Sequence, residues 1–271
     1  MRQLRITGLC LLAAFALGAV ASATASAELP ELRECAKVKV KGTGIWNKGC
    51  KVEGKHNREL KENEYEIQPW NLEAKKFKAK VFKGKGKGSN LDVVALGEIT
   101  CTSSTDEGKF TSPKTAGGIK VTFKGCEVDH EKCSNVIREG KEVPGEIKTN
   151  TLDGEVGYIN KANKEVGADL KAEAPGGYEA EFHCGTNPPL NVVVKGSVIG
   201  FVTPINTFTK KATFTFERLG TTQRPEKLEG GLPDTLVVQT CSGCNPVGAG
   251  EDASGMQNKV ENTGEELELV G

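Results

Sequence analysis

Residues able to carry out acid–base or metal chemistry are few and scattered along this chain. The 271 residues include only three histidines, His56, His130 and His183. His130 stands between Asp129 and Glu131, but consecutive side chains of an extended chain or loop point apart and do not converge on one metal ion. No serine occupies the centre of a G-x-S-x-G motif. The sequence therefore predicts no metal site and no cofactor, and it argues against a serine–histidine hydrolase.

Paired carboxylates are the other arrangement that could support catalysis. Asp153 and Glu155 are one such pair, and a glycosidase needs two carboxyl groups held about 5 to 10 Å apart. The chain contains 36 acidic residues, so pairs of this kind also arise by chance. An extracellular glycan hydrolase is therefore the alternative function, with no residue assigned a catalytic role.

The first 27 residues have the pattern of a secretory signal peptide. Two arginines precede an apolar run from Leu9 to Val20, and the segment ends in Ala25-Ser26-Ala27. A basic start, a short apolar middle and an A-x-A end are typical of such a peptide, and the apolar run is too short to cross a bilayer. We expect the mature chain to begin at Glu28, to lack a transmembrane segment and to be secreted or held at the cell surface.

The charge balance excludes a function that depends on strong positive charge. The whole chain has 36 Lys and Arg residues and 36 Asp and Glu residues. Removal of the leader with its two arginines leaves a net charge near −2. A dedicated nucleic-acid binder would show a clear basic excess, so we expect no nucleic-acid partner.

The elements that must position any site are short strands. The chain has 33 glycines and 11 prolines, and segments such as Ile119–Phe123 and Tyr178–Phe182 alternate in polarity with a period of two. This pattern predicts an all-β fold, either an antiparallel sandwich or a partly closed barrel. We expect the all-β domain to span residues 28–240, with residues 28–96 as a possible edge subregion. Residues 241–271, rich in Gly, Glu and Asn, are predicted to form a flexible acidic tail.

Eight cysteines follow the leader, and an even number in an exported chain indicates a disulfide framework. Strand parity directs Cys101 and Cys184 into the core, whereas Cys126 faces outward toward the loop that ends at Cys133. Cys101 with Cys126 is the main rival pairing. Cys241-Ser-Gly-Cys244 is followed by Asn-Pro, which favours a structural turn over a redox helix. The predicted pairs are Cys35–Cys50, Cys101–Cys184, Cys126–Cys133 and Cys241–Cys244.

A binding surface is predicted in the first third of the chain, where aromatic residues and lysines gather. Its candidate residues are Trp46, Tyr65, Trp70, Lys76, Lys78 and Lys80. The aromatic rings could form a stacking platform for a polysaccharide or could pack in the core. The lysines could contact an anionic envelope polymer or could protect an exposed strand edge from pairing.

Several segments between Glu98 and Gln223 carry a resemblance to a known group of proteins. They include Ile99–Ser103, Val121–Glu127, Gly145–Asn150, Leu152–Tyr158 and Val194–Gly200. With these segments the chain resembles uncharacterised exported, cysteine-containing β-proteins of actinobacterial type. The resemblance implies export and a shared β scaffold, and it transfers no catalytic residue.

Together these observations predict an exported, non-enzymatic protein that acts at the cell surface or outside the cell. We expect it to act by binding or by structural association. This role is preferred to the hydrolase because catalysis needs a convergent set of groups with tuned pKa values.

Overall fold

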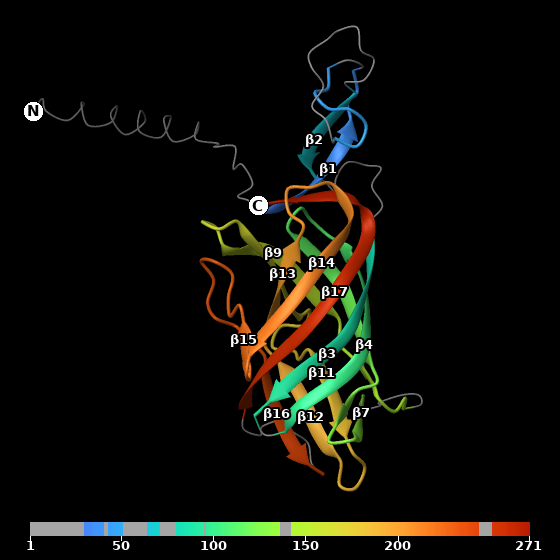
Figure 1. The fold of residues 1–271 in the computed structure, drawn as a ribbon, viewed down its shortest axis with the longest axis vertical. Coiled ribbons are helices and arrows are strands. Elements are labelled where there is room, and N and C mark those ends of the chain that lie inside the picture. Colours follow the sequence, from blue (N-terminus) through green and yellow to red (C-terminus); the bar gives the residue numbers. More distant parts are fainter. Residues whose placement is uncertain are drawn as a thin grey trace, which may run out of the picture.

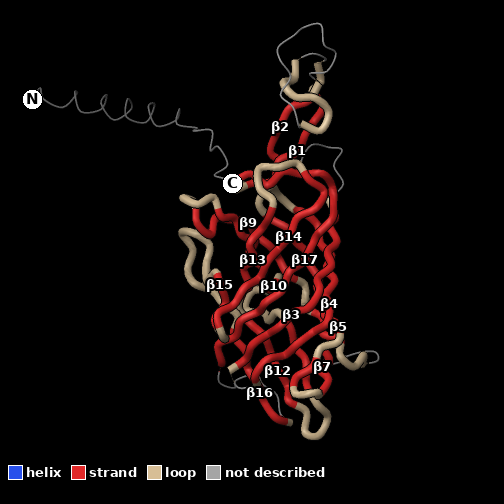
Figure 2. The backbone as a smooth tube through the Cα atoms, in the orientation of Figure 1, coloured by secondary structure: helices blue, strands red, loops and turns tan. Residues whose placement is uncertain are grey.

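The fold is built entirely from strands. The computed structural model describes residues 30–40, 43–50, 64–70, 80–94, 96–135, 142–243 and 251–271. These residues form 17 strands and no helix, which confirms the predicted all-β class (Figure 2). The signal peptide predicted over residues 1–27 lies outside the described residues.

The strand bounds are β1 (Glu31–Lys37), β2 (Tyr65–Pro69), β3 (Val81–Val93), β4 (Gly97–Phe110), β5 (Thr115–Lys124), β6 (Glu127–Val128), β7 (Glu131–Asn135), β8 (Glu146–Lys148), β9 (Leu152–Asn160), β10 (Glu165–Ala172), β11 (Ala180–Cys184), β12 (Leu190–Lys195), β13 (Ser197–Thr203), β14 (Thr209–Leu219), β15 (Thr222–Arg224), β16 (Val237–Ser242) and β17 (Glu251–Val270). All pairings between them are antiparallel.

The pairings close the sheet into two rings that share three long strands. The upper ring runs β3-β4-β5-β9-β10-β13-β14-β17 and returns to β3. The lower ring runs β3-β4-β6-β7-β11-β12-β16-β17 and also returns to β3. Figure 1 shows the rings stacked along the long axis, with β3, β4 and β17 common to both. Because the rings share a wall, the sheet is not a single regular barrel.

Strand β17 corrects the prediction that residues 241–271 form a flexible acidic tail. It pairs with β3 over Ser254–Thr263 and with β14 over Asn258–Leu267, and its ends pair with β16 and β1. The period-two alternation of polarity is weak in the sequence of β17, because several inward positions carry small or polar residues, such as Ser254 and Asn258, instead of large apolar ones. The all-β domain therefore extends to the end of the chain.

Strand β3 corrects the assignment of residues 28–96 to an edge subregion. It is paired on one side by β17 and on the other by β4, so it lies inside the sheet. The predicted alternation between buried and exposed residues is nevertheless present in β3. Phe82, Gly84 and Gly86 are buried, whereas Lys83, Lys85 and Lys87 are exposed. In this region β1 and β2 pair with each other and extend beyond the rings, and the start of β1 also pairs with the end of β17 (Figure 1).

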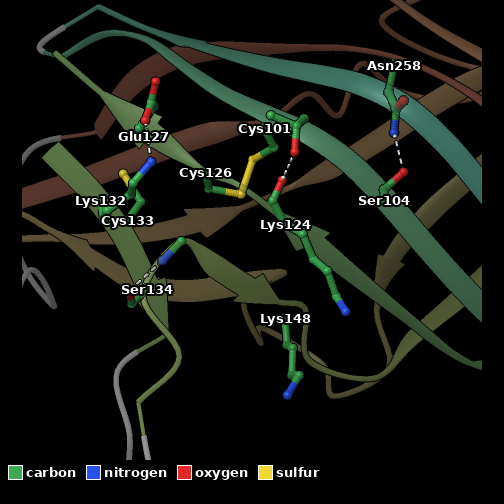
Figure 3. Close-up of a disulfide and its surroundings, with 12 residues drawn as sticks. Cys101, Ser104, Lys124, Cys126, Glu127, Lys132, Cys133, Ser134, Lys148 and Asn258 are labelled. Atoms are coloured by element: carbon green, nitrogen blue, oxygen red, sulfur yellow. Dashed lines mark hydrogen bonds and ion pairs between the residues drawn. A yellow bond between two sulfur atoms is a disulfide. The ribbon is translucent and has the colours of Figure 1, made fainter. Parts of the chain in front are cut away.

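The disulfides confirm one predicted pair and correct two. Cys35 is bonded to Cys50, as predicted. Cys101 is bonded to Cys126 (Figure 3), which is the rival pairing. Cys133 is bonded to Cys184. The predictions of Cys101 with Cys184 and of Cys126 with Cys133 are wrong.

Strand order explains these corrections. Strand β7 lies beside β11, which places Cys133 directly opposite Cys184. Strand β6, which follows Cys126, pairs with β4 next to Cys101. Strand parity in the sequence does not reveal which strands are neighbours. Cys241 is also disulfide-bonded, and its predicted partner Cys244 lies outside the described residues.

Peptide mapping of the non-reduced protein should recover Cys101–Cys126 and Cys133–Cys184. The Cys133–Cys184 bridge closes 51 residues, so replacing both of these cysteines by serine should lower the free energy of unfolding by about 4 kcal/mol. The same change at Cys35 and Cys50, which close 15 residues, should cost about 3 kcal/mol. Denaturant unfolding measures both values. Recovery of a Cys101–Cys184 peptide would contradict the observed strand order.

Candidate functional site

Of the three predicted platform aromatics, Trp70 is buried in the core, whereas Trp46 and Tyr65 are half-buried. Trp70 is 0% exposed, and its ring packs edge-on against Phe110 with the ring centroids 6.2 Å apart. Trp46 is half-buried and forms an isolated β-bridge with Tyr65. A fully buried indole cannot stack on an external sugar, so for Trp70 core packing is the correct interpretation.

The lysines of the predicted surface are only partly described. Lys80 is half-buried, with its Nζ 3.2 Å from Glu34 Oε2, so it forms an ion pair within the protein. Lys76 and Lys78 lie outside the described residues. Further along, Lys83, Lys85 and Lys87 project from the outer face of β3, where Lys83 pairs with Glu107 at 3.8 Å.

The candidate catalytic groups are also not brought together. Asp129 and His130 lie in the turn between β6 and β7, and no group of three or more His, Cys, Asp or Glu in the described part of the chain could hold a metal ion. Asp153 and Glu155 lie on β9 opposite Lys171 and Asp169 of β10. Leu152 and Gly154 are buried, whereas Asp153 is half-buried and Glu155 is exposed, so this pair belongs to the outer side of the sheet.

A cavity of about 220 Å³ lies inside the rings and is the strongest candidate for a functional site. Its wall is almost entirely apolar and comes from both rings. Lining residues of the upper ring include Phe82, Phe110 and Leu170, and those of the lower ring include Phe182 and Val194.

One wall of the cavity carries paired polar side chains. With its amide oriented to donate, Asn262 of β17 bonds both carboxylate oxygens of Asp106 on β4, at 3.0 and 3.2 Å. Asn258 Nδ2 donates to Ser104 Oγ at 3.2 Å (Figure 3). These groups fit because β3 has glycine between them, and a Cβ at Gly84 would overlap both Asp106 and Asn262. Burial raises the pKa of Asp106 to about 6, although the hydrogen bond from Asn262 opposes the shift.

Glu179 is the lining residue with the most unusual environment. It lies just before β11, where the two rings meet, and its amide donates to the carbonyl of Val194 on β12. It is 4% exposed, and neither carboxylate oxygen has a hydrogen-bond partner among the described residues. Burial raises the pKa of Glu179 to about 8; the nearby Ala172 amide opposes this shift without forming a hydrogen bond of good geometry.

The negative surroundings of Glu179 act in the same direction as its burial. The charges of Asp169 and Asp234 raise its pKa further. Burial also raises the pKa of Asp169, whose Oδ1 has no hydrogen-bond partner in the described structure. Glu179 is therefore mostly protonated at neutral pH when the cavity is empty.

Sequence reasoning missed Glu179 because it assigned this residue to the outer face. The alternation in Tyr178–Phe182 places Ala180 and Phe182 inward and Glu179 outward. In the structure β11 begins only at Ala180, so Glu179 lies in an irregular stretch where two consecutive residues are buried. The Gly84 and Gly86 alternation on β3 is a signal that could have indicated a close approach of interior side chains.

Comparison with protein-family models, with curated proteins and with solved structures found no match to this chain. In the described ranges no helix is both long and apolar enough to cross a membrane.

The titration of Glu179 predicts how stability depends on pH. A carboxyl whose pKa is raised by folding binds its proton more tightly in the folded state, so its contribution to stability is lost as pH rises from the unfolded value toward the folded value. For Glu179 this window runs from about 4.5 to about 8. Burial raises the pKa of Asp106 to about 6 and also raises the pKa values of Asp169 and Glu268, so the comparison with a Glu179 variant assigns the slope to Glu179.

Between pH 6 and pH 8, deprotonation of Glu179 should lower the free energy of unfolding of the wild type by about 2 kcal/mol, since one pKa unit corresponds to about 1.4 kcal/mol. Glu179→Gln has no carboxyl at this position and should not show this loss. Denaturant unfolding at a series of pH values measures this difference. Glu173→Gln, which changes an exposed carboxyl nearby, serves as the control and should keep the wild-type slope. Identical slopes for Glu179→Gln and wild type would contradict the assignment.

Proposed function

We propose that this protein is an exported, non-enzymatic binding protein that holds an apolar small molecule in the cavity enclosed by its two rings. The observation that carries the proposal is the cavity itself, at about 220 Å³ with an apolar wall. An engineered apolar cavity of about 150 Å³ in another protein stays dry and binds benzene, so a space of this size can hold a small apolar ligand. Closure by paired strands makes the site largely preformed, which lowers the cost of binding.

The cavity approaches the protein surface at one end. Its lining includes Lys210 and Lys211, which are exposed at the start of β14. The register between β14 and β17 shifts between Thr209 and Lys211, so the ladder is interrupted at this point. This irregular end of the upper ring is the natural route for a ligand.

A glycan is a poor occupant of this cavity. Each sugar hydroxyl that leaves water needs a hydrogen-bond partner, and the wall supplies few of them. The half-buried Asp106 and the buried Glu179 are surrounded by an otherwise apolar wall, which favours an apolar ligand over a polysaccharide. An apolar-ligand binding protein is therefore preferred to a glycan hydrolase.

Export and the envelope contact are separate parts of the proposal. The disulfides support export, because such bonds form and persist in oxidising compartments. Contact with an anionic envelope polymer through the lysines stays a prediction. The outer face of β3 carries Lys83, Lys85 and Lys87, but Glu107 and Glu261 on the neighbouring strands reduce its net positive charge.

An uncharged fluorescent probe such as N-phenyl-1-naphthylamine should bind the folded protein with increased emission. Ala168→Phe, which fills the cavity from β10, should weaken binding at least about tenfold because the added ring occupies the space of the ligand. Fluorescence titration measures both affinities. Ala253→Phe adds the same ring to an exposed position of β17 and should bind as the wild type does. Absence of probe binding to folded wild-type protein would contradict the proposed function.

A further inference from the structure

The polar groups that face the cavity differ in whether the protein satisfies them. Asp106 is bonded by Asn262, and Ser104 is bonded by Asn258. Ser89 Oγ and Asn258 Oδ1 on the same wall also lack a partner, but among the lining carboxyls of the described residues only Glu179 has both oxygens buried and unpartnered. Buried polar atoms are nearly always hydrogen-bonded, so an exception on the wall of a cavity points to a partner that arrives with the ligand.

The charges around Glu179 indicate the sign of that partner. Neighbouring elements contribute Asp169 from β10 and Asp234 from the segment before β16, and both are acidic. Among the described lining residues the basic ones are Lys114, Lys210 and Lys211, which belong to the end of the upper ring and not to the junction where Glu179 lies. Lys171, on the same outer face of β10 as Asp169, lowers the pKa of that aspartate, whereas the charges that shift the pKa of Glu179 are the two aspartates and include no cation of the described residues.

While the cavity is empty, a bound proton neutralises the carboxyl of Glu179. Burial and the two neighbouring aspartates favour the neutral carboxyl, which avoids an uncompensated charge in an apolar space. A buried carboxylate is stable only when it is paired with a cation and hydrogen-bonded. An ammonium group provides both, because it carries a positive charge and three donors.

We propose that the cavity takes an apolar molecule with a single amine, and that the ammonium of this ligand replaces the proton on Glu179. The inference rests on the proposed function and names the chemical class of its ligand. The carboxyl of Glu179 loses its proton to solvent, and the resulting carboxylate accepts hydrogen bonds from the ammonium of the ligand. One proton is therefore released for each protonated amine bound, while the apolar body of the ligand fills the space between the two rings.

The test compares hexylamine, hexanol and hexanoate, which share one chain length and differ in the head group. Isothermal titration calorimetry at pH 7 should give the tightest binding for hexylamine, by about tenfold over hexanol, because its contact with Glu179 is charge-assisted. Hexanoate should bind most weakly because its charge is repelled. Repetition in buffers of different ionisation enthalpy should show release of nearly one proton with hexylamine and none with hexanol.

Glu179→Gln should remove both the preference for hexylamine and the proton release, while its affinity for hexanol stays within about threefold of the wild type. Glu173→Gln, the exposed control, should keep both. Equal binding of the three compounds, or a preference for hexanol or hexanoate, would overturn this inference and leave the proposed function intact. Absence of binding for all three, together with absence of probe binding, would overturn the proposed function as well. Proton release from the wild-type protein decides the question even if Glu179→Gln does not fold.

Discussion

The antiparallel pairing of β17 with β3 and β14 is the interaction on which the enclosed interior depends. This strand runs from Glu251 to Val270 and belongs to both rings. Without it, β3 and β14 would each present an unpaired edge, and water would reach the apolar wall of the cavity. Closure removes these edges and satisfies their backbone groups, so one strand determines both the stability of the sheet and the presence of a site.

The interior shows a trade-off between stability and binding. Glycines on β3 make room for Asp106 and Asn262, which satisfy each other at the wall. Glu179 has no such partner among the described residues and remains neutral only through the rise in its pKa. A natural chain that keeps an unsatisfied acid in an apolar space forgoes some stability there, and sites of this kind are where function is expected.

The general fold was predictable from the sequence, but the arrangement of its parts was not. Period-two alternation, as in Ile119–Phe123, predicts strands from local information. The number of neighbours of β3 and the role of β17 depend on pairings between segments far apart in the chain. The alternating lysines of β3 give the same sequence pattern whether the strand lies at a sheet edge or faces outward from a closed ring. A strand rich in Gly, Glu and Asn, such as β17, has the sequence of a tail when its inward residues are polar.

The cavity was beyond the reach of sequence reasoning for a related reason. Glu179 looks like an outward residue of a regular strand, and only the late start of β11 turns it inward. The parity argument turned Cys126 outward, but β5 ends at Lys124 and Cys126 is buried in the core, where it meets Cys101. Local patterns therefore predict which residues can face a core, whereas the topology decides which of them meet.

Hydrogen–deuterium exchange of the β17 amides tests most directly whether this strand closes the protein. If β17 closes both rings, peptides covering residues 254–263, which pair with β3, should exchange as slowly as the most protected peptides of β4. Exchange of these peptides within seconds under native conditions, while β4 stays protected, would show that residues 251–270 form a tail and would contradict the enclosed cavity.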